Sequence, residues 1–214
     1  GNVSVISGGN ISESTSGNNI AANVLRLEAG GSIGAAGAGN ALDTDVATLS
    51  SKSALGTYIL EANGLTLDDN GGVTVTRINL DSTTAAVTDN ALSRAGESDG
   101  IYKVETTDGT IVIAASSVSE AVLAAGDILI RAGGAGSGLT QNAGANIEST
   151  GGNISLLAQN AIAQNANVTA TNGTIDVEAF DSTLTMADGT VSTSGDGNIR
   201  YAASGDIALG LLHP

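Results

Sequence analysis

A repeat of about 22 residues in the last third of the chain constrains the fold more than any other feature. Three consecutive units each carry three apolar positions, and equivalent positions in neighbouring units lie 21 to 24 residues apart. Around these positions apolar and polar side chains alternate, as in Ile175–Ala179. A period of two is typical of a β-strand and argues against a helical repeat. The predicted apolar columns are Ile147, Val168 and Val191, then Ile154, Ile175 and Ile199, then Ile162, Leu184 and Ile207.

Three short strands per repeat, stacked unit upon unit, predict an all-β parallel β-helix, also called a β-solenoid. Less regular copies of the pattern extend toward the N-terminus, at Leu25–Ala29, Thr57–Ala62 and Gly126–Ala132. We therefore expect one solenoid segment over residues 1–214, with roughly nine coils and a length of about 45 Å at ~4.8 Å per coil. Both ends lie inside apparent repeats, so we also expect this segment to be cut from a longer repeat chain.

Glycine, asparagine and aspartate recur where the predicted chain turns, for example at Asn172-Gly173, Asp188-Gly189 and Asp196-Gly197. These residues tolerate the positive φ that tight corners between strands require. The Gly/Ala-rich stretches 34–41 and 133–138 are predicted to be corner loops.

One stretch does not follow the repeat. Residues 81–100 are polar and lack strand alternation. We expect a looped excursion from one coil near 81–100, with a helical turn around Ala91–Arg94.

The charge balance limits the partners that the chain can have. It carries 22 acidic residues against 7 basic ones, for a net charge of −15. Nucleic acids and anionic membrane surfaces need a basic stripe, so neither is expected as a partner. No apolar run approaches the ~20 residues of a membrane-spanning helix, and no transmembrane segment is expected. The absence of cysteine fits a bacterial surface protein exported without disulfide bonds, and it is equally compatible with the cytoplasm.

Several phrases of the sequence resemble a known family. They are Gly152–Ala158 (GNISLLA), Gly173–Ala179 (GTIDVEA), Gly31–Gly34 (GSIG) and Asn40–Leu49 (NALDTDVATL). Together they resemble the filamentous-haemagglutinin-like β-helices of giant bacterial surface and exported repeat proteins. The resemblance covers most of the chain and is weakest over residues 81–100. It implies a right-handed parallel β-helix that acts as a stalk, fibre or adhesin.

Parallel β-helices also include polysaccharide lyases and hydrolases, so carbohydrate binding or cleavage is kept as an alternative. Asp176 and Glu178 are predicted to point outward on one strand about 7 Å apart, near the separation of an inverting glycosidase pair. Alignment of the coils places Arg200 beside Asp176 and Arg131 in the column of Glu178, which favours a solvated charge ladder instead. The single histidine, His213, lies next to the C-terminus. No catalytic or cofactor-binding residue is predicted, and the chain is expected not to be an enzyme.

Calcium is the one cofactor that the sequence leaves open. Oxygen ligands are abundant, and two acidic stretches, Asp68-Asp69-Asn70 and Asp89 to Asp99, could hold an isolated ion. However, the nine-residue repeats of calcium-loaded β-rolls are missing, and a solvated loop is the alternative at both places. No metal-ligating residue is therefore assigned.

Two leucines mark a possible contact surface. Leu129 and Leu157 should point outward on the second face, because Ile128, Ile130 and Leu156 point inward. Exposed leucines on a strand face are typical of a contact between rods or domains. Cover by the loop 133–143 is an equal alternative.

Taken together, the sequence predicts a structural or adhesive extracellular segment of a bacterial surface protein. The expected partners are neighbouring repeats of the same protein, including head-to-tail self-assembly.

Overall fold

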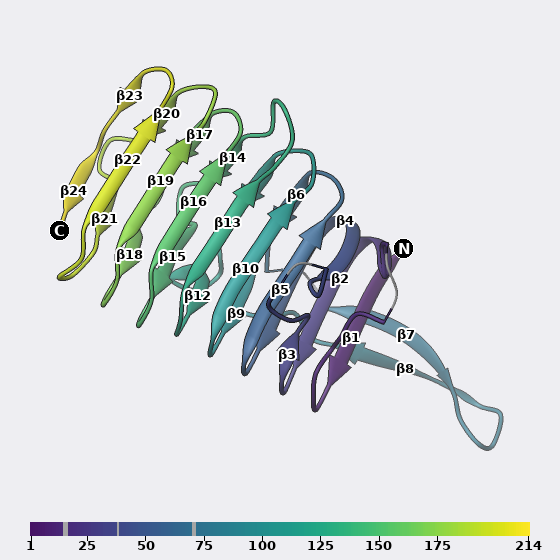
Figure 1. The fold of residues 1–214 in the computed structure, drawn as a ribbon. Helices are drawn as coiled ribbons and strands as arrows, with labels where there is room; N and C mark the ends of the chain where they lie inside the picture. The colour runs from purple at the N-terminus through teal and green to yellow at the C-terminus, as the bar shows by residue number, and fades with distance from the viewer. Residues whose placement is uncertain (15–16, 38, 70–71) are drawn as a thin grey trace.

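The computed structural model describes residues 1–14, 17–37, 39–69 and 72–214. The chain is an all-β parallel solenoid of about nine turns, and the described residues contain no helix (Figure 1). Within these ranges one sheet of 22 strands, all paired in parallel, forms the solenoid, and two further strands form a separate antiparallel hairpin. The all-β parallel solenoid predicted from the repeat is confirmed.

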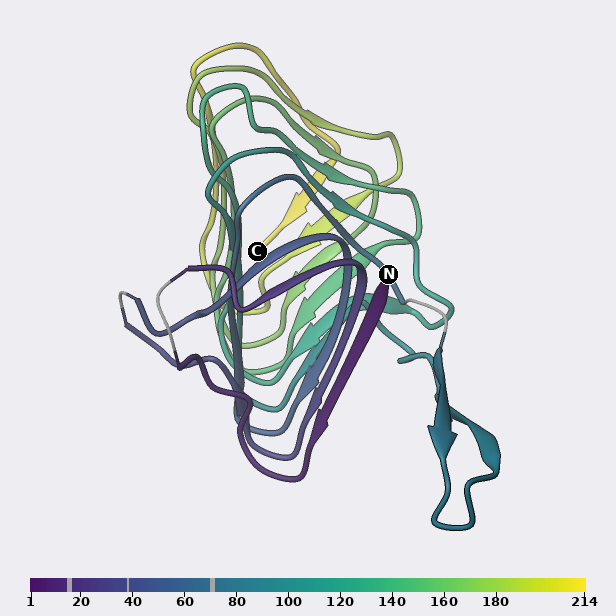
Figure 2. The same cartoon turned by 90° about the vertical axis from the view of Figure 1, so that its right-hand side faces the viewer.

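Strands from successive turns stack in three columns, which can be followed along the axis in Figure 2. The first column contains β1 (Asn2–Ser7), β2 (Ile20–Ala29), β4 (Leu42–Ser53), β9 (Gly96–Ser98), β12 (Glu120–Ala124), β15 (Asn146–Ser149), β18 (Val168–Ala170), β21 (Val191–Thr193) and β24 (Leu211–His213). The second contains β3 (Ser32–Ile33), β5 (Gly56–Glu61), β10 (Ile101–Thr106), β13 (Ile128–Ala132), β16 (Ile154–Ala158), β19 (Ile175–Ala179) and β22 (Ile199–Ala203). The third contains β6 (Leu65–Leu67), β11 (Ile111–Ile113), β14 (Leu139–Gln141), β17 (Ile162–Gln164), β20 (Leu184–Met186) and β23 (Ile207–Ala208).

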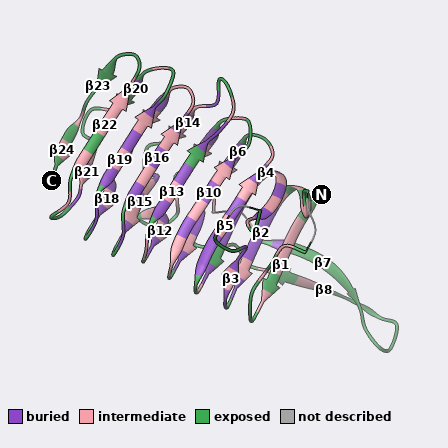
Figure 3. Ribbon diagram, viewed as in Figure 1, coloured by how far each residue is buried: buried purple, intermediate pink, exposed green. Residues whose placement is uncertain are grey.

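The core is a set of apolar ladders that run along the solenoid axis. In the second column Ile154, Ile175 and Ile199 are in register, and in the third Ile162 is in register with Leu184. Inward residues are buried and their neighbours on the strand are half-buried or exposed, as Figure 3 shows in purple, pink and green. Each turn buries its inward side chains only against the turns on either side, so stability is a sum of neighbour contacts.

Corner residues bond each turn to the next. The Oδ1 atom of Asn146 accepts the backbone N–H of Asn167 at 3.0 Å, and Oδ1 of Asn167 accepts the N–H of Val191 at 2.9 Å. At another corner Oδ1 of Asp127 accepts the N–H of Asn153 at 2.8 Å, and Asn153 repeats this toward Thr174 at 3.0 Å. The Asn and Asp residues of the repeat therefore satisfy corner N–H groups that the sheet leaves unpaired.

Glycines at corners have two different roles. Gly189 has a φ of 82°, so the turn predicted at Asp188-Gly189 does use the left-handed region. Gly173 has no positive φ, but a Cβ there would lie 2.5 Å from the carbonyl carbon of Gly152 in the turn before it. Gly152, Gly173 and Gly197 thus form a ladder in which backbone packs on backbone and no side chain fits.

The predicted place of Val191 in the core is wrong. Val168 is in register with Ser192, not with Val191, and it is Ser192 that is fully buried. A shift of one residue moves every side chain of a strand to the opposite face. The Ser192 hydroxyl is accommodated inside because it bonds Tyr201 Oη at 2.6 Å and Gln164 Nε2 at 2.9 Å.

The excursion is real, but its boundaries and structure differ from the prediction of a loop near 81–100. The chain leaves the solenoid after β6 and forms the hairpin of β7 (Val73–Ile78) and β8 (Thr84–Asp89), which projects from the body in both views (Figures 1 and 2). Residues 91–94 form no helical turn, and Gly96–Ser98 is already strand β9 of the first column. The threonine-rich segment pairs with itself, in register from Val73–Asp89 to Ile78–Thr84.

Candidate functional surface

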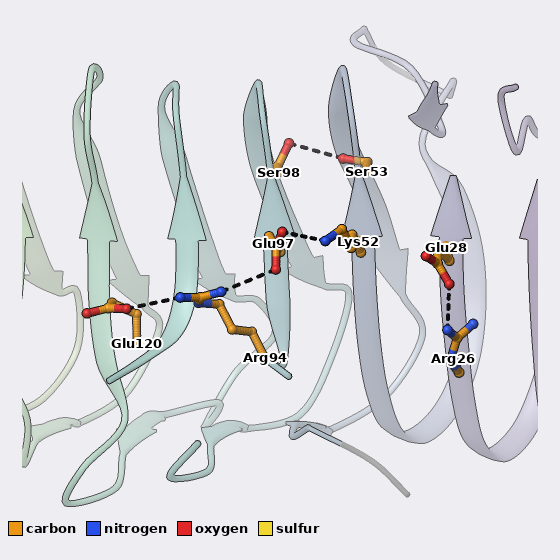
Figure 4. A network of polar contacts seen from close by, with 8 residues as sticks. All are labelled: Arg26, Glu28, Lys52, Ser53, Arg94, Glu97, Ser98 and Glu120. Carbon is orange, nitrogen blue, oxygen red and sulfur yellow. Dashed lines mark hydrogen bonds and ion pairs between the residues drawn. The ribbon is translucent and has the colours of Figure 1, made fainter. Parts of the chain in front are cut away.

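The outward side of the first column carries a continuous run of ion pairs (Figure 4). Lys52 and Glu97 are in register on neighbouring strands, and their charged atoms are 2.7 Å apart. Arg94 reaches in from residues 90–95, which we call the return segment because they lead from the hairpin back to β9. Its guanidinium lies 3.3 Å from Glu97 and 3.2 Å from Glu120. One arginine thus bridges two turns and fixes the return segment to both.

Local hydrogen bonds favour the charged form of the Glu120 carboxylate. A hydrogen bond from Ser119, together with the bond and charge of Arg94, lowers the pKa of Glu120 against the opposing effect of burial. The side chains of Arg94, Glu97 and Glu120 are each only about one-fifth exposed. The ion pairs are therefore screened less by solvent than ordinary surface pairs.

A second arginine holds the other end of the return segment. Arg26 is 5 % exposed, its Nε donates to the carbonyl of Asn90 at 2.7 Å, and its Nη2 pairs with Glu28. Ser4 and Ser50 flank Arg26 in register on the neighbouring strands. Within the described residues, Arg26 Nη1 and both serine hydroxyls are buried without a hydrogen-bond partner. Arg26 and Arg94 together fasten the base of the hairpin to the first column.

The outward side of the second column carries separate ion pairs. Glu105 lies 2.6 Å from Lys103 and 3.5 Å from Arg131. The predicted pairing of Arg200 with Asp176 is confirmed at 2.7 Å, and Arg200 also binds Glu178 at 2.7 Å.

The contacts of Arg200 concern the two acids, Asp176 and Glu178, that were considered as a glycosidase pair. The hydrogen bond from Arg200 lowers the pKa of Glu178, whereas the general acid of a glycosidase needs a raised pKa. Asp176 shares the same arginine. Both acids are therefore joined through one arginine, as in a charge ladder.

Leu129 and Leu157 do point outward on the second column, on β13 and β16, and both are half-buried. They are not opposite one another, because Leu129 is in register with Ser155 and Leu157 with Arg131. The two leucines thus lie diagonally between charged residues. Their role as a contact surface stays a prediction.

The two acidic stretches considered for calcium, Asp68 to Asn70 and Asp89 to Asp99, lie in different parts of the fold. Burial, followed by the bond and charge of Asp69, raises the pKa of Asp68, while Asp69 accepts the backbone N–H of Ser117 at 2.8 Å. Asn70, the third residue of that stretch, lies outside the described residues. Asp89 ends the hairpin and Asp99 follows β9, so that stretch is divided between two elements. No group of three or more potential metal-ligating side chains occurs among the described residues.

Sequence reasoning did not find the buried carboxylate of Glu61. Glu61 is the last residue of β5, and its side chain points inward and is fully buried. Burial raises the pKa of this carboxyl group. The carboxylate accepts the Thr44 hydroxyl at 2.7 Å and the backbone N–H groups of Val46 at 3.1 Å and Asn63 at 3.2 Å. Its position in the alternating pattern, where Thr57 and Ile59 are inward, was the available signal.

A cleft of about 510 Å³ lies between the loops that follow the first two turns. Its polar lining includes Ser12, Glu13, Asn40 and Asp43. The Oε2 atom of Glu13 is buried and has no hydrogen-bond partner among the described residues. Hydroxyl, amide and carboxylate groups in such a cleft suit a hydroxyl-rich ligand, although none of the described lining residues is aromatic.

Comparisons of this chain with protein-family models, with curated proteins and with solved structures found no match. Across the described ranges, no helix has the length and hydropathy to cross a bilayer.

Proposed function

We propose that this chain is a structural or adhesive segment of a bacterial extracellular protein, in which it forms part of a stalk or fibre. In this proposal the coil is right-handed, with about 22 residues and three short strands, as in the filamentous-haemagglutinin-like β-helices that the sequence resembles. The observation that supports it is the uninterrupted stack. Inward ladders give a continuous core, and the outward sides of two columns are occupied by paired charges. Such a stack transmits load along its axis through parallel strand pairing.

In this proposal assembly runs along the axis, through the turns at either end of the segment. Inward residues there are only half-buried, among them Val3 and Val5 at one end and Ile199 and Tyr201 at the other. The strands of these turns also present unpaired backbone groups, on which another turn of the same kind can stack. The partners in this proposal are therefore neighbouring repeats or further copies of the chain.

Electron microscopy of the purified chain over a concentration series, with and without calcium, tests axial assembly. We expect filaments that lengthen with concentration. Val5→Lys places a charge on the core-facing side of the end strand and should stop growth, whereas Ile6→Lys, on the exposed side of the same strand, should not. Rods of one length at every concentration would contradict assembly through the ends.

Protease treatment of intact producing cells tests the extracellular location. Loss of the segment from intact cells is expected, because the proposal places it outside the membrane. Full protection until the cells are lysed would contradict it.

The cleft beside Glu13 favours one second candidate, carbohydrate binding. Binding of oligosaccharides to the purified chain tests it. Support would be weaker binding in the Glu13→Gln variant and unchanged binding in the Asp188→Asn variant, since Asp188 is remote from the cleft lining.

A further inference from the structure

The hairpin β7–β8 stands apart from the stacked strands. Its two strands pair with each other and with none of the described solenoid strands, so they form a two-stranded sheet. Most of its side chains are exposed, including Val75 at 58 % and Ile78 at 76 %, and Leu80 at its tip is fully exposed. An isolated two-stranded hairpin is marginally stable in water, and a third strand stabilises it.

The hydrogen-bond pattern shows which backbone groups are free. At the turn, Asn79 N–H donates to the carbonyl of Thr83 at 2.8 Å, and the next pair is Ile78 with Thr84. Bonded and non-bonded pairs alternate along an antiparallel ladder. Thr84, Ala86 and Thr88 of β8 are therefore in non-bonded positions, with N–H and C=O directed away from β7.

This outer edge of β8 has none of the devices that keep edge strands apart. Natural edges are protected by lysine, proline or bulges. Between Thr84 and Thr88 the sequence is TAAVT, without a charge or a proline, and the pairing register runs from Val73–Asp89 to Ile78–Thr84 without a bulge.

We propose that β8 pairs with β8 of a second copy of this chain, antiparallel and about a twofold axis at Ala86. In this register Ala86 faces Ala86 of the second copy, and Thr84 faces its Thr88. The free N–H and C=O groups of all three positions then find partners. The result is a four-stranded sheet that joins two solenoids side by side, an interaction separate from stacking along the axis.

The side chains fit this twofold arrangement. Thr84, Ala86 and Thr88 lie on one face, and Thr88 Oγ1 already bonds Thr74 Oγ1 of β7 at 2.7 Å. Adding Thr84 of the second copy extends this row of hydroxyls, and threonine pairs opposite one another are favourable. Asp89 would face Thr83, so no like charges oppose each other across the new pair. A twofold interface must be self-complementary in this way.

Net charge opposes any association of two copies, since each carries −15. Six-residue strands are about 20 Å long, so the projecting hairpins hold the two bodies further apart than the Debye length of ~10 Å at 0.1 M salt. Repulsion between the bodies is therefore largely screened at 0.1 M salt and above, and the dimer should weaken only at lower ionic strength, where the Debye length grows.

A cysteine placed on the proposed axis tests the register directly, because the chain contains no cysteine of its own. Opposed residues of a bonded antiparallel pair have Cα atoms about 5.5 Å apart, within the range of a disulfide. Ala86→Cys should give a covalent dimer on mild oxidation. The matched control is Thr76→Cys, since Thr76 is directly opposite Ala86 within the hairpin but faces the other edge. No dimer with Ala86→Cys, or equal amounts with both variants, would overturn the proposal.

Sedimentation equilibrium in high salt gives a second readout. We expect a concentration-dependent dimer in the unmodified chain. Ala86→Lys, which sets two like charges on the axis, should raise the dimer dissociation constant about tenfold or more, and Thr76→Lys should leave it within about twofold. A chain that is monomeric throughout the concentration range overturns the proposal, as does equal weakening by both lysines.

Discussion

Replacing Gly96 with alanine tests how the core is filled where the chain re-enters the stack. Gly96 occupies an inward position of the first column, between Ser51 and Val122. The missing side chain is replaced by the ring of Tyr102, which is fully buried. A Cβ at Gly96 would lie 2.5 Å from Tyr102 Oη and 2.6 Å from Cε2, and closer still to Cζ. Ordinary carbon contacts are about 3.5–4.0 Å, so the ring or the strand has to move by roughly 1 Å.

The ring has little room to move. Tyr102 is paired on both sides, with Thr57 and with Ile128, and its hydroxyl bonds Ser51 at 3.4 Å. Overpacking of a tight core costs about 1–3 kcal/mol, and we expect Gly96→Ala to fall near 2 kcal/mol. For a chain of this length this corresponds to a fall in Tm of about 4–8 °C.

Urea unfolding followed by circular dichroism measures this change. The control is Gly8→Ala, because a Cβ at Gly8 meets nothing within 4 Å and Gly8 has no positive φ. We expect no loss of stability there. Tyr102→Leu should destabilise the chain alone, yet it should relieve the clash, so that the double variant is about 1–2 kcal/mol more stable than the sum of the single changes. Additive effects, or equal effects of Gly96→Ala and Gly8→Ala, would refute the idea that the ring fills the space of the missing side chain.

Three further changes probe the corners, the buried acid and the hairpin base. Gly173→Ala should cost about 3 kcal/mol in urea unfolding, since its Cβ would overlap the backbone of Gly152; a cost below that of an exposed Gly→Ala change would contradict this. Burial raises the pKa of Glu61, so its contribution to stability is present below the unfolded pKa of the group and is lost as pH rises through the folded pKa. As pH rises from acidic to neutral, the Glu61→Gln variant should therefore become more stable relative to the unmodified chain. A difference in urea midpoint between the two chains that stays constant with pH would argue against a raised pKa of Glu61. Arg94→Ala should change global stability by only about 1 kcal/mol but speed thermolysin cleavage near the hairpin, while Arg77→Ala should not; equal rates would show that Arg94 does not anchor the return segment.

The stacking of strands in the last third of the chain could be predicted, because its apolar positions recur with a nearly constant spacing. Ile154, Ile175 and Ile199 fell in register as expected, and so did Arg200 beside Asp176. The outward direction of Leu129 and Leu157 followed from the same alternation. Corner residues could be predicted in the same way, and their asparagine side chains do bond the neighbouring turn of the solenoid.

The candidate surface was less accessible to sequence reasoning. Arg26 has the pattern of an outward, solvated residue, yet it is buried and donates to Asn90 of the return segment. Arg94 and Glu120 are 26 residues apart, and nothing local indicates that they meet. Such contacts depend on where an irregular segment crosses the stack, and an irregular segment has no period from which its path could be inferred.

The sequence by itself determined the strand period, the inward ladders and the corners, because these repeat in every turn and each turn reports on the next. Only the tertiary structure decided the register at Ser192, the hairpin at residues 73–89 and the burial of Glu61. The physical reason is clearest at Ser192. A two-residue alternation assigns side chains to one of two faces, but it does not say which face is inward when both a valine and a serine can be accommodated. The inward face is set by tertiary partners, here the hydroxyl of Tyr201 in the same turn and the amide of Gln164 in an earlier turn.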